Sequence, residues 1–139
     1  MSDGFVADAS VGVAWAVHSQ ASTATDDRLD QVATGISLFV PTLWTFEVAH
    51  SLLALMRRGK ILAEDRDRAL AALSQLPLMI DDEGPHRAFG MISKVAAEHG
   101  LSVYDAAYLE LAVRRDVPLA SRDQALCKAA HQCGVRLLT

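Results

Sequence analysis

The sequence has few cysteines and no long apolar run. Its two cysteines, Cys127 and Cys133, are too few for a disulfide framework and form no CxxC pair. His131 lies between them, but no fourth zinc ligand is apparent, so we interpret both as buried thiols. No apolar stretch reaches the roughly 18 to 20 residues of a membrane helix, and the polar Ser2 and Asp3 do not resemble a signal segment. We therefore expect a cytoplasmic protein without a membrane span.

An excess of positive charge is also missing. The net charge is −4, which argues against a protein that coats nucleic acid through many phosphate contacts. A nuclease is still compatible with this charge, because it needs only a local basic rim beside an acidic centre. Solvated helix ends explain paired basic residues at least as well as such a rim. The candidates for the rim are Arg57, Arg58, Lys60, Arg114, Arg115 and Arg122.

The chain is long enough for one core. It has 139 residues, of which 51% are hydrophobic, and it contains no repeat or linker, so we expect a single domain over residues 1–139. Short β-rich runs alternate with stretches of helical apolar spacing. The runs span 5–8, 36–40, 78–80, 117–120 and 135–138, and the helical stretches span 10–18, 22–34, 42–58, 64–76, 85–99, 103–115 and 123–131. Strands separated by helices predict an α/β fold: a three-layer α/β/α sandwich with a parallel five-stranded sheet.

Four acidic residues occupy positions where such a sheet gathers functional groups. Asp8 closes the first strand, and Asp123 lies just past the fourth. Asp105 begins a helix, and Glu47 lies near the start of the helix after the second strand. The carboxyl ends of parallel strands form a crevice, so all four carboxylates can face one edge. Clustered carboxylates oppose ionisation together, and a divalent cation relieves that cost. Oxygen ligands favour Mg²⁺ or Mn²⁺, and such a site suits phosphodiester hydrolysis.

Each acid also has an ordinary structural explanation. Asp8 and Asp123 can cap helices, Asp105 is favourable in a first helical turn, and Glu47 can lie on a solvated face. The Glu47-x-x-His50 pair is typical of di-iron bundles only when duplicated, which it is not. A phosphoryl-transfer domain is disfavoured because Ser10, not an acid, lies two residues after Asp8.

Four fragments in order along the chain closely resemble PIN-domain proteins, in particular VapC-type toxins. Each fragment alone is weak, but together they run through nearly the whole sequence. They are Phe5-Val6-Ala7-Asp8-Ala9-Ser10, Pro41-Thr42-Leu43-Trp44-Thr45-Phe46-Glu47-Val48, Tyr104-Asp105-Ala106-Ala107-Tyr108 and Ser121-Arg122-Asp123 with Leu126.

The resemblance implies a role for each matched residue. Asp8, Glu47, Asp105 and Asp123 would form the acidic quartet that binds Mg²⁺ or Mn²⁺, with Asp8 and Asp105 as direct ligands. Ser121 would orient a ligand or a water. His50 stands where many members have Asn, which puts the contacts of that position in question.

The resemblance also implies an activity and partners. The activity would be endonucleolytic hydrolysis of RNA by a metal-activated water, in the toxin of a type II toxin-antitoxin pair. A small antitoxin protein would bind the acidic groove, and a homodimer is typical of such relatives. The apolar helix faces at 52–56 and 69–73 are candidates for partner surfaces, although core packing explains them too. The alternative is a catalytically weak module whose acidic pocket mainly docks a partner protein.

Overall fold

The computed structural model describes residues 4–138, so Ser2 and Asp3 lie outside the described residues. Within that range, a parallel sheet has its strands in the order β3-β2-β1-β4. The strands are β1 (Gly4–Ala7), β2 (Ser37–Pro41), β3 (Leu78–Asp81) and β4 (Leu119–Ala120). In the central register, Val6 pairs with Phe39 on one side and with Leu119 on the other.

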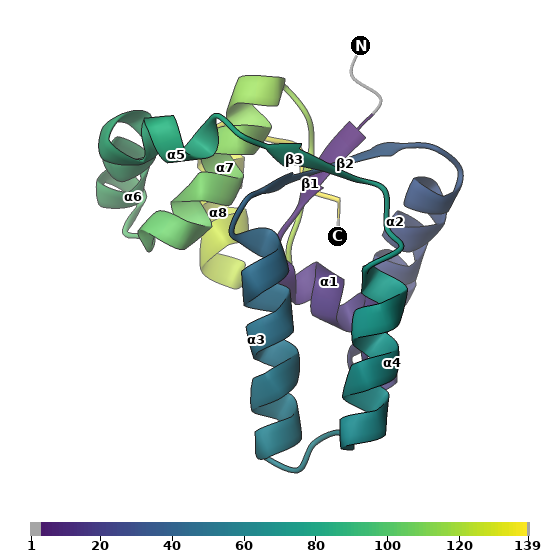
Figure 1. The fold of residues 1–139 in the computed structure, drawn as a ribbon. Helices are drawn as coiled ribbons and strands as arrows, with labels where there is room; N and C mark the ends of the chain where they lie inside the picture. Colours follow the sequence, from purple (N-terminus) through teal and green to yellow (C-terminus); the bar gives the residue numbers. More distant parts are fainter. Residues whose placement is uncertain (1–3, 139) are drawn as a thin grey trace.

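Helices flank the sheet, one set around α7 (Val103–Arg115) and another around α1 (Ala9–Ala16). The other α-helices of the described residues are α2 (Thr23–Ala33), α3 (Trp44–Arg57), α4 (Ala63–Leu73), α5 (Gly84–Arg87), α6 (Ser93–His99) and α8 (Gln124–Gln132). Helix α7 packs on β1, β2 and β4 and contacts α6 and α8, whereas α1 contacts β1, α2, α3 and α4. Helices α3 and α4 lie side by side and project away from the sheet (Figure 1). The predicted α/β fold with a helix-flanked parallel sheet is therefore confirmed.

The sheet is buried along its central strands. All four residues of β1 are buried, and Leu38 and Val40 of β2 are fully inaccessible. Such continuous apolar strands are typical of parallel sheets covered on both faces. Leu52, Leu55 and Ala69 are also buried. The faces at 52–56 and 69–73 thus contribute to the core. No helix in the described part of the chain is long and apolar enough to span a membrane.

The predicted fifth strand at 135–138 is wrong. This segment makes only one parallel bridge, between Leu119 and Leu137, with hydrogen bonds from Leu119 N to Arg136 O and from Leu138 N to Leu119 O. Because β4 has only two residues, it offers too short a template for a neighbouring ladder. The sheet therefore has four strands among the described residues.

Two further differences from the sequence prediction concern Gly90 and Pro41. The helix at 85–99 is broken at Gly90, whose backbone (φ −115°, ψ −108°) is not helical, and a π turn at Ala88–Ile92 joins α5 to α6. The break in the predicted helix therefore falls at a glycine. Pro41 is the last residue of β2 and pairs with Asp81, rather than standing outside the strand.

A close approach of α1 and α3 fixes the start of α1 against the core. A Cβ atom added at Gly12 would lie 2.6 Å from Trp44 Cζ2 and 3.0 Å from Val48 Cγ2. The indole Nε1 of Trp44 donates a hydrogen bond to the backbone oxygen of Asp8 at 3.2 Å. The same packing that needs glycine therefore places α3 beside the end of β1.

We predict that Gly12→Ala destabilises the protein. The helix propensity of alanine is favourable by up to about 1 kcal/mol, but overpacking against Trp44 costs about 1 to 3 kcal/mol. The expected result is a net loss of about 1 kcal/mol in the free energy of unfolding, measured by denaturant titration. A variant that is more stable than the wild type would show that α1 and α3 can move apart far enough to accept the added methyl group.

Candidate metal centre

Asp8 lies where β1, β4 and α1 meet. Its backbone N–H donates to Ala120 O at 3.1 Å, and its side chain accepts from Val11 N at 3.3 Å as the N-cap of α1. The Ser10 hydroxyl donates to Oδ1 at 2.6 Å, and the Ser121 hydroxyl donates to Oδ2. The Asp8 carboxylate is therefore buried and held from both sides.

The two serine hydroxyls also join the ends of β1 and β4. Ser10 Oγ accepts from Arg122 N at 3.0 Å, and Ser121 Oγ accepts from Asp123 N at 3.0 Å. Each hydroxyl thus donates to Asp8 and accepts from the segment after β4. Asp8 and the start of α8 are consequently fixed relative to each other.

Glu47 reaches the same region from α3. It lies in the first turn of the helix, and the Tyr108 hydroxyl donates to its Oε1 at 2.5 Å. Tyr108 belongs to α7, so this hydrogen bond joins two helices across the sheet edge. Burial, the hydrogen bond to Glu47 and the surrounding carboxylates raise the pKa of the Tyr108 phenol well above its usual range, so it remains a proton donor to Glu47.

Asp105 and Asp123 lie in or beside the first turns of two further helices. Asp105 is in the first turn of α7, and its backbone N–H donates to the N-cap Ser102 at 3.0 Å. Asp123 is the N-cap of α8 and accepts from Leu126 N at 3.0 Å. The ordinary explanations weighed from the sequence therefore hold for Asp8, Asp105 and Asp123.

Electrostatic coupling shows that the structure brings the four acids into one group. Burial is the largest cause that raises the pKa of Asp8, and the charge of Asp123 raises it further. Burial also raises the pKa of Glu47, and Asp105 and Asp8 add to this. For Asp105, burial is again the largest cause, followed by the charges of Asp123 and Asp8. The charges of neighbouring acids thus oppose the ionisation of Asp8, Glu47 and Asp105.

The donor chemistry of this group fits a hard cation. In the described part of the chain, none of the four carboxylates forms an ion pair with Lys, Arg or His. Carboxylate oxygens are the ligands that Mg²⁺ and Mn²⁺ prefer. As they stand, however, no three acidic, histidine or cysteine side chains among residues 4–138 are placed to hold one ion. The acids form a loose, mutually repelling group rather than a finished ligand set.

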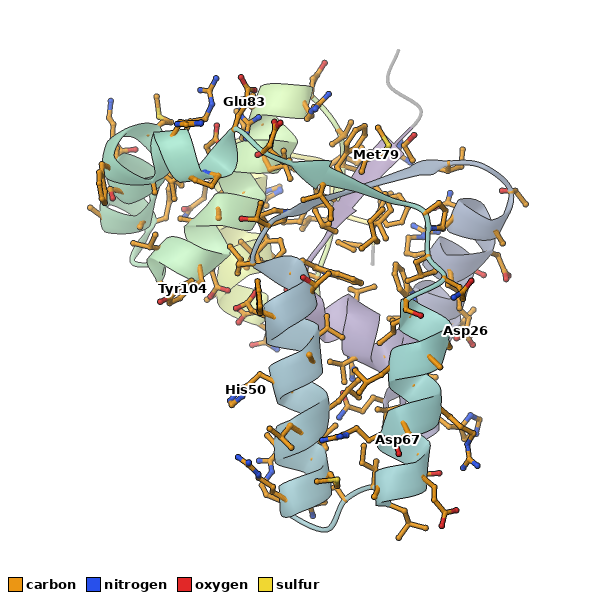
Figure 2. The ribbon with its side chains drawn as sticks, viewed as in Figure 1. Asp26, His50, Asp67, Met79, Glu83 and Tyr104 are labelled. Atoms are coloured by element: carbon orange, nitrogen blue, oxygen red, sulfur yellow. The ribbon has the colours of Figure 1, made fainter. Side chains whose placement is uncertain are left out.

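The remaining predicted residues separate into two places. Ser121 is buried and bonds directly to Asp8. His50 is exposed on the outer side of α3 and points away from α4 (Figure 2). It lines a shallow cavity with Ser10, Gln20 and Arg58. The structure thus places Ser121 within the acidic group and His50 outside it.

The proposed basic rim is only partly correct. The Arg114 guanidinium lies 2.7 Å from Asp81 and 2.9 Å from Glu110, both of which are buried, so it belongs to an internal ion network. Hydrogen bonds from Arg114 hold the pKa of the Asp81 carboxyl below its usual range. The Arg115 guanidinium lies 4.9 Å from the Phe39 ring centroid. Of the basic residues considered, Arg122 lies next to the acids in the chain.

Other sequence interpretations are also corrected. Cys127 is half-buried, but Cys133 is exposed, with its Sγ 3.4 Å from His99 Nε2. The prediction of two buried thiols is therefore wrong for Cys133. The sequence reasoning also missed the contacts of Ser10 and Tyr108 with the acids. Both residues stand in the quoted fragments, Ser10 two residues after Asp8 and Tyr108 three after Asp105, which is the signal that could have found them.

The chain and its fold are similar to those of known proteins. A family model described as PIN domain matches residues 5–132. Ribonuclease VapC1 of Mycobacterium tuberculosis is 34% identical over 101 residues, which are 70% of this chain and 72% of that protein. Among solved structures, PAE2754 from Pyrobaculum aerophilum has a TM-score of 0.71 at 23% identity and covers 99% of this chain and 92% of its own. FitAcB from Neisseria gonorrhoeae has a TM-score of 0.62 at 19% identity, with coverage of 97% and 96%.

We predict that Asp105→Asn stabilises the metal-free protein at neutral pH. Because the folded-state pKa of Asp105 lies above its ordinary value of 3.8, the stability that protonation adds is lost as the pH rises through that pKa. Removing the charge should raise the melting temperature by about 3 °C, measured by circular dichroism. The difference should narrow as the pH falls toward 3.8.

Asp27→Asn is the matched control, because it removes the same charge from an exposed position of α2. It should leave the melting temperature nearly unchanged at both pH values. An equal gain in both variants would mean that net charge, rather than the acidic group, causes the effect.

Proposed function

Because this chain belongs to the PIN-domain family, we propose that it is a Mg²⁺- or Mn²⁺-dependent endoribonuclease. The observation that carries the proposal is the group of four coupled carboxylates without a cationic partner among the described residues. The similarity to a protein named as a ribonuclease supports the choice of RNA as substrate.

The acids would hold the metal with different contributions. Asp8 and Asp105 are proposed as direct ligands, and Glu47 and Asp123 as ligands that bind directly, through water or through a second ion. When bound, the ion supplies charge neutralisation at the phosphate and lowers the pKa of a water that attacks it. Ion binding would also remove the mutual repulsion of the carboxylates.

The neighbouring side chains would keep the ligands ready. Ser10 and Ser121 hold the two oxygens of Asp8, so this carboxylate cannot turn away from the centre. Tyr108 occupies Oε1 of Glu47 and leaves Oε2 as an acceptor. Burial and the charges of Asp105 and Asp8 raise the pKa of Glu47, which would make its carboxylate a better proton acceptor for the attacking water than an ordinary carboxylate.

In the cell, the protein would act as the toxin of a type II pair in the cytoplasm. Its partner would be an antitoxin protein whose flexible segment enters the acidic group. An arginine on that segment would form charge-assisted hydrogen bonds with the carboxylates and so occupy the place of the metal. A homodimer is part of this proposal.

The second candidate is a binding module that docks a protein through the acidic pocket without useful turnover. It is favoured by the absence of a finished ligand set among residues 4–138. The two functions differ in one measurable property: a binding module forms no cleavage products on addition of metal.

We predict metal-dependent cleavage of single-stranded RNA that Asp8→Asn reduces by more than about a hundredfold, since changes behind a ligand alone cost 10 to 100-fold. Asparagine caps helices as well as aspartate, so α1 should remain intact. The measurement is cleavage in Mn²⁺, in Mg²⁺ and in EDTA, with circular dichroism of each protein. Asp27→Asn should cut normally. Equal activity of Asp8→Asn and the wild type would contradict the assignment.

We predict that Mn²⁺ or Mg²⁺ raises the melting temperature of the wild-type protein at neutral pH. At a hundredfold excess over Kd, binding to the native state alone stabilises by about 2.7 kcal/mol. The shift should be much smaller for Asp105→Asn, which lacks a proposed ligand, and should shrink in the wild type at acid pH as the carboxylates protonate. Differential scanning fluorimetry measures both. Equal melting-temperature shifts in the wild type and in Asp105→Asn would show that the ion binds at a site other than the acidic group.

A further inference from the structure

A cavity adjoins the acidic group on the side of α2 and α8. Its volume is about 310 Å³, at the low end of the roughly 300 to 1,000 Å³ of small-molecule sites. It is formed by α1, the first turns of α2, the end of β4 and the start of α8. Ser121, whose hydroxyl holds Asp8, is among its lining residues. The cavity is therefore separated from the acidic group by a single residue.

The cavity differs in charge from the neighbouring centre. Two arginines, Arg28 and Arg122, line it, and none of its described lining residues is acidic. Apolar side chains make up much of the remaining wall, including Val11, Ala24 and Leu138. A cationic end and an apolar wall form an amphipathic pocket beside an anionic site.

The arginines have donors available for a ligand. The Nε atom of Arg28 is buried and has no hydrogen-bond partner within residues 4–138. Leaving a buried donor unpaired is unfavourable, and an acceptor that reached this atom as the side chain adjusts to a ligand would relieve that cost. The backbone N–H of Arg122 donates a hydrogen bond to the Ser10 hydroxyl. The Nη1 atom of Arg122 makes one long contact of 3.4 Å with Gln20 Oε1. Its guanidinium therefore retains most of its donors.

We propose that this cavity is a subsite for one nucleotide of the RNA, next to the phosphodiester that is cleaved. Arg28 and Arg122 bind its phosphate, and the apolar wall receives its unstacked base. The acidic group repels RNA phosphates, so a cationic pocket at its border offsets that repulsion where the strand must enter. This inference rests on the proposed ribonuclease function and adds to it the residues that position the strand.

The first test is the kinetics of Arg28→Gln with single-stranded RNA and Mn²⁺. The expected result is a KM raised about tenfold, as for the loss of one charge-assisted hydrogen bond, with kcat changed less than about twofold. The slope of log KM against log salt should fall by about 0.7, because one phosphate contact is lost. Arg136→Gln, an exposed residue outside the cavity, should change neither value. An unchanged KM and salt slope in Arg28→Gln would overturn the subsite.

A second variant keeps both arginines and fills the cavity. Ala24→Phe adds a ring at the start of α2, where residue 24 is partly exposed and lines the cavity. It should raise KM about as much as Arg28→Gln without lowering the salt slope, because the ring excludes the base from the apolar wall and leaves the phosphate in contact with both arginines. A normal KM in a folded Ala24→Phe protein would show that RNA does not use the cavity. This variant also serves if Arg28→Gln does not fold.

Binding of 5′-AMP to metal-free protein separates this inference from the proposed function. Saturable amide shifts in nuclear magnetic resonance spectra at Thr25, Arg28 and Gln124, absent in Ala24→Phe, would support the subsite even if the wild type cut no RNA. That lack of cleavage would overturn only the ribonuclease proposal. No saturable shift at millimolar 5′-AMP, or shifts confined to other surfaces, would overturn the subsite even if RNA were cut.

Discussion

Repulsion among four carboxylates at one sheet edge is the constraint to which the rest of this structure responds. Asp8, Glu47 and Asp105 each have a raised pKa, because burial and neighbouring charge both oppose ionisation. Asp8 and Glu47 receive hydroxyl hydrogen bonds, which compensate part of this cost without neutralising the charge. A salt bridge would stabilise the group more, but it would occupy the oxygens that the proposed metal would need. The group therefore lacks stabilisation that the proposed ion would supply on binding.

The backbone brings these acids together by simple means. Asp8 and Asp123 follow β1 and β4, which are hydrogen-bonded neighbours, so parallel pairing alone makes them adjacent. Glu47 depends on a packing contact instead, because α3 approaches α1 closely at Gly12. Its position is therefore sensitive to core side chains that lie outside the acidic group. A substitution in the core can change the acidic group without changing its residues.

The sequence predicted those features that follow from local patterns and chain direction. Strand ends at Asp8 and Asp123 needed only apolar runs and the parallel topology. The fifth strand was not predictable, since its pairing depends on the length of β4 rather than on its own β-rich residues. The basic rim was only partly correct for a related reason. Nothing in the sequence shows that Arg114 pairs with Asp81 or that Arg115 lies over the Phe39 ring, because both contacts are tertiary. Arg28 belongs to no motif, so the sequence did not single it out.

The helix-capping and functional explanations of the acids are complementary. A carboxylate at a helix N-terminus accepts backbone N–H groups and interacts favourably with the positive end of the helix dipole. This interaction partly offsets the repulsion and orients Asp8 and Asp123 at the strand ends. Capping is therefore one way in which the fold tolerates charges that have no cationic partner among residues 4–138. Because neutral asparagine can cap equally well, capping alone does not require an acid at these positions, and the negative charge needs a separate explanation such as a cation.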